Sequence, residues 1–162
     1  MSEFDLLPAI AEIAVALLGF AAIFTVFQER GGSGGTPDGR FWTMLQFGFA
    51  TLVFALLPLP FLASGVPEAN CWGASSAAFA VFGAYVPILG ARSLRRDHAA
   101  GRPPNLPIFT LIFGGSLLSL LLLVYNAVEL RVFWPYLAAL VWFCLATALV
   151  FLRLIQAWVG RE

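Results

Sequence analysis

The sequence contains no lysine, and its only histidine is His98. A retinal pigment needs a lysine amine within a membrane span to form its Schiff base, so that class is excluded. Membrane-bound haem needs axial ligands buried between helices, usually histidines, and His98 lies in an arginine-rich linker. A b-type cytochrome is therefore excluded as well.

Cysteine is scarce too, because Cys71 and Cys144 are the only two and lie in different hydrophobic segments. There is no Cys-x-x-Cys pair for thiol oxidoreduction, and His, Asp and Glu do not cluster at metal-ligand spacing. Span serines such as Ser116 and Ser119 have no histidine or lysine in the same span to act as a base. The sequence therefore supports no enzymatic activity, and we expect no cofactor and no metal ion.

Charged residues make up only 11% of the chain, whereas hydrophobic residues make up 60%. This balance is typical of a membrane protein rather than of a soluble domain. The net charge is zero and no basic face is visible, so nucleic acid is not an expected partner. We expect the lipid bilayer to be the surrounding medium.

Five hydrophobic stretches are long enough to cross a bilayer, whose core of about 30 Å requires roughly 20 residues of helix. They cover approximately residues 5–27, 41–64, 71–93, 106–128 and 133–157. Pro58, Pro60 and Pro87 interrupt the second and third stretches, and such prolines kink membrane helices without abolishing them. We predict an all-α membrane protein, a bundle of five transmembrane helices forming one domain over residues 1–162.

The arginines predict how this bundle is oriented. With five spans, eight of the nine arginines flank the side that holds the first-to-second linker, the third-to-fourth linker and the C-terminus, and only Arg131 flanks the other. Arginine-rich loops stay in the cytoplasm. We therefore expect the N-terminus outside and the C-terminus inside.

Glu12 is the candidate functional residue of the first span. It lies about 10 Å inside the outer end at about 1.5 Å per residue, with no basic residue at that depth. An ionisable group within a span is costly and usually faces the bundle interior or water, so Glu12 is a candidate for binding a proton or a small cation. Alternatively, a neutral Glu12 holds helices together by hydrogen bonding.

Polar residues in the outer halves of the other spans are candidate supporting ligands for an ion or proton. These are Ser75, Ser76, Tyr125, Asn126 and Tyr136. Taken singly, the tyrosines are also explained as interface aromatics and the asparagine as a residue at a helix C-terminus.

On the first span, Glu12 shares a helical face with the small residues Ala9, Ala16 and Gly19. Small residues allow helices to approach closely, so we expect this face to be buried. Five short helices bury little surface in one chain, so we also expect a symmetric homo-oligomer.

Four arginines near the inner membrane surface are candidates for binding anionic lipid headgroups. They are Arg92, Arg95, Arg96 and Arg153. The alternative is that they determine topology and nothing more.

Three strings, residues 11–20, 135–140 and 151–155, resemble small uncharacterised bacterial membrane proteins of about five spans. The resemblance implies a bacterial inner-membrane location, and it marks Glu12, Tyr136 and Arg153 as motif positions. It implies no activity.

Three functions are open at this point. The first is an oligomeric membrane protein that conducts or senses a small cation or proton through Glu12. The second is a non-catalytic assembly or anchoring subunit of a larger membrane complex. The third is a lipid-binding protein that uses Arg153 and the arginine-rich linker between the third and fourth spans.

Overall fold

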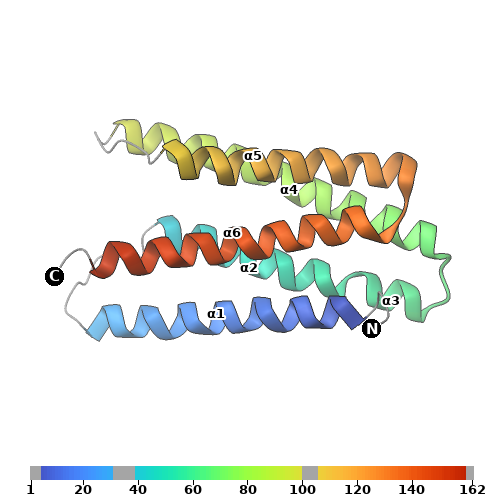
Figure 1. Cartoon of the computed structure of the whole chain (residues 1–162), viewed down its shortest axis with the longest axis horizontal. Coiled ribbons are helices and arrows are strands. Elements are labelled where there is room, and N and C mark those ends of the chain that lie inside the picture. Colours follow the sequence, from blue (N-terminus) through green and yellow to red (C-terminus); the bar gives the residue numbers. More distant parts are fainter. Residues whose placement is uncertain (1–4, 31–38, 100–105, 160–162) are drawn as a thin grey trace. The chain divides into compact units, whose positions relative to one another are not determined.

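The computed structural model describes residues 5–30, 39–99 and 106–159, and every regular element in them is a helix (Figure 1). The predicted all-α class is therefore confirmed. In chain order the elements are α1 (Leu6–Arg30), α2 (Gly39–Leu56), α3 (Pro58–Ala63), α4 (Glu68–Ala99), α5 (Leu106–Tyr125), the π-helix η2 (Asn126–Leu130) and α6 (Phe133–Val159).

Four helical segments of the described residues are long and apolar enough to cross a membrane. They are Leu6–Ile23, Phe41–Ala63, Phe109–Leu130 and Phe133–Arg153. The chain is thus a multi-pass membrane protein by the length and composition of its helices. The predicted third span, residues 71–93, lies within α4, but the side chains from Leu89 onward are outside the described residues, and a fifth span stays a prediction.

The second predicted span is divided between α2 and α3 at Leu57. Pro58 occupies the first position of α3, where a missing N–H costs nothing, but neither Pro58 nor Pro60 can donate a backbone hydrogen bond to the preceding turn. Leu57 itself keeps right-handed helical angles. The prolines interrupt the hydrogen bonding of this segment without ending it, as the sequence predicts.

The chain divides into two compact units. The first contains α1, α2 and the part of α6 from Phe143 onward. Gly48 of α2 is buried where Leu18 of α1 and Thr147 of α6 converge, and a side chain there would overlap Leu18. The rings of Phe47 and Phe143 pack with centroids 5.1 Å apart. Helix α2 thus packs against both α1 and α6.

The second unit contains α3, α4, α5, η2 and the part of α6 up to Trp142. Trp72 of α4 packs on Phe133 and Tyr136 of α6, with ring centroids 5.1 Å and 5.9 Å away. Phe79, two turns further along α4, meets the edge of the same tyrosine at 5.8 Å. These rings form the centre of the unit.

Helices α5 and α6 approach closely where Trp142 lies over Gly115. A Cβ atom at Gly115 would overlap the six-membered part of the indole ring. The indole Nε1 also donates a long hydrogen bond of 3.5 Å to Ser116 Oγ. The absence of a side chain at Gly115 therefore sets the distance between these two helices.

We expect Gly115→Ala to destabilise the protein by about 1–3 kcal/mol, because the added methyl group forces Trp142 out of its position. The matched control is Gly83→Ala in α4, whose Cβ would make only ordinary contact, 3.7 Å from Leu120 Cδ1. That variant should be unchanged or stabilised by up to about 1 kcal/mol through helix propensity. Unfolding in detergent, followed by tryptophan fluorescence, measures both; equal stabilities would contradict the close contact.

Candidate functional site

Glu12 lies on the side of α1 that faces away from the rest of its unit. The buried side of α1 consists of Leu7, Ile10, Ala11, Ala14 and Ala21, whereas Glu12, Ala16 and Gly19 are exposed. The predicted burial of the Glu12 face is therefore wrong for the single chain. Helix α1 is apolar nearly all round, so its small residues alone do not determine which side packs.

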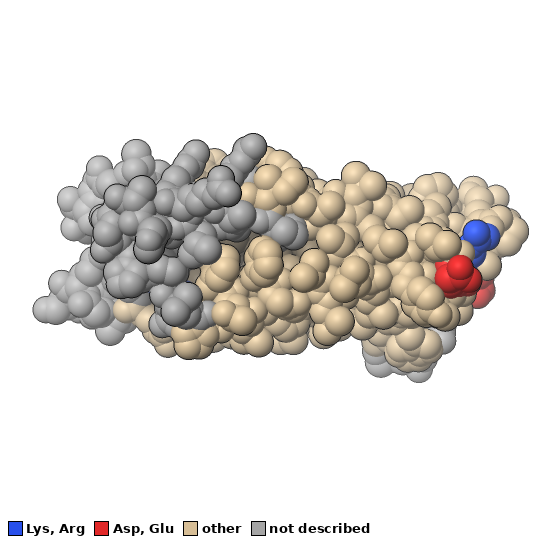
Figure 2. Space-filling model, turned by 90° about the horizontal axis from the view of Figure 1, so that it is seen from above, with Lys and Arg blue, Asp and Glu red and all other residues tan. Residues whose placement is uncertain are grey.

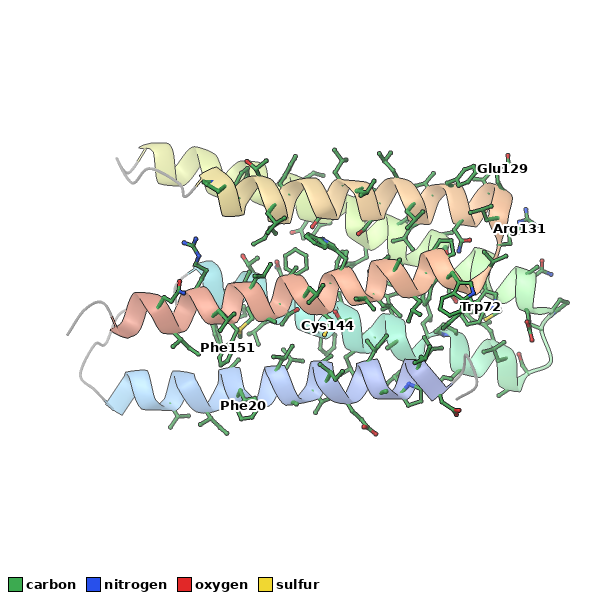
Figure 3. The ribbon with its side chains drawn as sticks, in the orientation of Figure 1. Phe20, Trp72, Glu129, Arg131, Cys144 and Phe151 are labelled. Carbon is green, nitrogen blue, oxygen red and sulfur yellow. The ribbon has the colours of Figure 1, made fainter. Side chains whose placement is uncertain are left out.

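The surroundings of Glu12 are apolar. Ile13 and Val15 beside it are exposed hydrophobic residues, and Phe20, labelled in Figure 3, is a further one two turns along. Glu12 makes no hydrogen bond or ion pair with any part of the chain that the structure describes. A carboxyl group thus stands without a partner within a segment that is apolar enough to span the bilayer.

Asn126, by contrast, is fully buried and uses its side chain within the chain. Its Nδ2 donates to Ser76 Oγ at 2.7 Å and to the Val132 carbonyl at 2.9 Å, and its Oδ1 accepts from the Val132 N–H at 3.1 Å. One carboxamide therefore holds the end of α5 to α4 and to the start of α6.

The backbone around Asn126 departs from a regular α-helix. The chain widens into the π-helix η2, and the Arg131 N–H donates to the Asn126 carbonyl at 2.8 Å. Arg131 then takes a left-handed conformation with φ 53°, which turns the chain into α6. A non-glycine residue is uncommon in that region, so surrounding contacts must hold it there.

The remaining predicted ligands of the second unit are also buried. Tyr136 has no exposed surface and packs between Trp72 and Phe79. Ser75 is equally buried, and its Oγ has no hydrogen-bond partner of good geometry among the described residues. The thiol of Cys71, one turn earlier on α4, donates to the Pro58 carbonyl at 3.6 Å.

Tyr125 differs from these neighbours because its side chain is 53% exposed, with no hydrogen bond to the described part of the chain. The six predicted ligands thus differ in their surroundings within each unit, and their binding of an ion stays a prediction. Ser75, Ser76, Asn126 and Tyr136 are internal to the second unit, Tyr125 is on its surface, and Glu12 belongs to the first unit.

The charged groups near the start of α6 lie at the end of the apolar segment Phe109–Leu130 or just beyond it. Glu129 and Arg131 are exposed at the connection between η2 and α6 (Figure 3). On the face shown in Figure 2, the described Arg, Asp and Glu side chains gather at one end, and the other described atoms are uncharged. This is the distribution that a bilayer imposes on charge.

Of the four arginines predicted to bind lipid headgroups, the structure describes only the side chain of Arg153, which is half-buried and has an interaction within the chain. The side chains of Arg92, Arg95 and Arg96 are outside the described residues. Headgroup binding stays a prediction.

No protein-family model, curated protein or solved structure matches the chain. Within the described residues, no three His, Cys, Asp or Glu side chains are grouped so that they could hold a metal ion.

We expect Asn126→Ala to lose about 1–3 kcal/mol of stability, because it removes a buried carboxamide that makes three hydrogen bonds, two with the Val132 backbone and one with the buried Ser76. Ser76→Ala removes one acceptor only and should cost about 0.6 kcal/mol, the average for a hydrogen bond between membrane helices. Unfolding in detergent gives both values.

Ser75→Ala is the matched control for Ser76→Ala, since Ser75 is as fully buried and lies on the same helix but makes no hydrogen bond of good geometry in the described structure. It should be neutral or stabilising. A larger loss for Ser75→Ala than for Ser76→Ala would contradict the network around Asn126.

Proposed function

We propose that this protein is an oligomeric, non-catalytic membrane protein that conducts or senses protons or small cations, with Glu12 as the binding group at the contact between subunits. The observation that carries the proposal is the carboxyl group of Glu12, exposed on an apolar helix and without a partner among the described residues. Asn126 and Tyr136 support the fold rather than the ion.

The bilayer makes this carboxyl group expensive unless something covers it. Placing a charged carboxylate in the middle of a membrane helix costs about 2.5–3.5 kcal/mol on insertion scales, and less nearer the interface. Uptake of a proton or a cation removes that charge, and a hydrogen-bonding group from another subunit satisfies the oxygens. We therefore expect the binding of a proton or cation by Glu12 and the association of subunits to affect one another.

We also propose that the protein lies in the bacterial inner membrane with its N-terminus outside and its C-terminus in the cytoplasm. The support is the arginine distribution together with the multi-pass architecture. Labelling of a cysteine placed at Arg95 by an impermeant reagent from outside intact cells would contradict this orientation.

In liposomes containing the purified protein, we expect a proton or cation flux that Glu12→Gln largely abolishes, because the amide is neutral and can no longer exchange a proton. The matched control is Glu129→Gln, which changes an exposed carboxyl group in η2, one residue from the end of its apolar segment, and should leave the flux unchanged. A pH-sensitive dye inside the vesicles reports the rate.

Equal flux for the original chain, Glu12→Gln and empty liposomes would contradict the proposal. It would favour the second candidate, an assembly or anchoring subunit. What supports that candidate is the exposed side of α4, where Ala74, Ala77, Ala78 and Ala84 leave room for a helix of another protein. Purification from membranes in mild detergent would then yield a stable complex with a different membrane protein.

A further inference from the structure

The stripe of α1 that carries Glu12 contains three further exposed residues at helical spacing, Ala16, Gly19 and Ile23. Gly19 has nothing within 4 Å of the position of a Cβ atom. A glycine in a helix interior costs about 1 kcal/mol relative to alanine. No described atom packs closely at Gly19 to offset that cost, and a contact with a helix of another copy would explain it.

A second stripe with related features lies on α5. Counting back from Tyr125, the residues Leu121, Leu118 and Gly114 follow at the same helical spacing and are all exposed. Leu118 has 68% of its surface exposed, the largest fraction among the leucines described as exposed. Gly114, like Gly19, has nothing within 4 Å of a Cβ position.

The polar residues of the two stripes lie at similar distances from the expected outer ends of their helices. Glu12 is about 9 Å from the first residue of α1, and Tyr125 is about 8 Å from the last residue of η2, at about 1.5 Å per residue. Tyr125 is the only exposed side-chain hydrogen-bond donor of the described residues between about 5 and 15 Å from the outer end of its helix. It is therefore the one donor in the described chain that matches the acceptor Glu12.

We propose that α1 of one copy packs against α5 of a neighbouring copy, in the antiparallel register that places Glu12 beside Tyr125 of that copy. In the five-span topology these two helices cross the bilayer in opposite directions. The inference rests on the proposed function in so far as the protein is an oligomer, and it names the partner as a second copy of the chain.

The register is supported by the sizes of the side chains along both stripes. Steps of four, three and four residues from Glu12 along α1 reach Ala16, Gly19 and Ile23, and the same steps back from Tyr125 reach Leu121, Leu118 and Gly114. Small residues thus face large ones at each step: alanine faces leucine, glycine faces the most exposed leucine, and isoleucine faces glycine. Knobs of one helix fill holes of the other.

The arrangement completes the Glu12 site from two copies. The Tyr125 hydroxyl donates to the Glu12 carboxylate of the adjacent copy, so neither polar group faces lipid. Because different surfaces of the two copies meet, the contact is heterologous. At every contact one copy then contributes the carboxyl group and its neighbour contributes the phenol.

The test is disulfide formation between single-cysteine chains in membranes, with Cys71 and Cys144 replaced by alanine. Two forms with different tags are produced together, one carrying Ala16→Cys and the other Leu121→Cys, or one Gly19→Cys and the other Leu118→Cys. We expect a mixed covalent dimer for both pairs, since facing residues of closely packed helices come within disulfide range. The control, Ala16→Cys with Leu117→Cys, is out of register and should give none.

Absence of mixed dimers for the matched pairs, an equal yield for the control, or dimers of Ala16→Cys with itself would each overturn the register. Loss of flux in Glu12→Gln without a mixed dimer would refute this contact while leaving the proposed function intact. Mixed dimers with no flux would support this contact and refute the proposed function.

A size exchange provides a second measurement that does not depend on cysteine. A Cβ atom at Gly19 meets no described atom within 4 Å, so we expect Gly19→Leu to leave folding unaffected while the oligomer dissociates in size-exclusion chromatography. Adding Leu118→Ala makes room for the new side chain and should restore the oligomer. An oligomer unaffected by Gly19→Leu would contradict the proposed contact.

Discussion

A bilayer offers no hydrogen-bond partners, so each polar group within a span must be satisfied by protein or carry a cost. Asn126 and Glu12 differ in this respect. Asn126 is satisfied internally, with three hydrogen bonds that join α4, the π-helix and the start of α6. Glu12 is not satisfied by the described chain, and this difference separates the residue that builds the fold from the residue that points to function.

Helix length and class could be predicted from the sequence because they depend on the number of consecutive apolar residues. The helical segments begin and end close to the expected positions, and the prolines at 58 and 60 interrupt hydrogen bonding where expected. The π-helix could not be predicted, because it depends on the pairing of Asn126 with Val132 and Ser76. The only sequence signal for the π-helix is a polar residue at the end of a hydrophobic span, just before the connection to the next helix.

The candidate site was harder to predict than the fold, because a helix that is apolar all round gives no indication of which side packs within the chain. The small residues beside Glu12 suggested burial, yet Leu7 and Ile10 on the opposite side are buried instead. The same small residues allow close helix packing with another copy of the chain. Gly19 and Gly114, where an added Cβ atom would meet no described atom within 4 Å, are then explained by close approach between subunits.

The central claim is that protein, and not lipid, covers the Glu12 side of α1. Oxygen accessibility of a nitroxide spin label in membranes measures this directly, with the label at Ala16 compared with Ile13, which is exposed on the adjacent side of the same helix. We expect low accessibility at position 16 and high accessibility at position 13. Equal, lipid-like values at both positions would contradict the account.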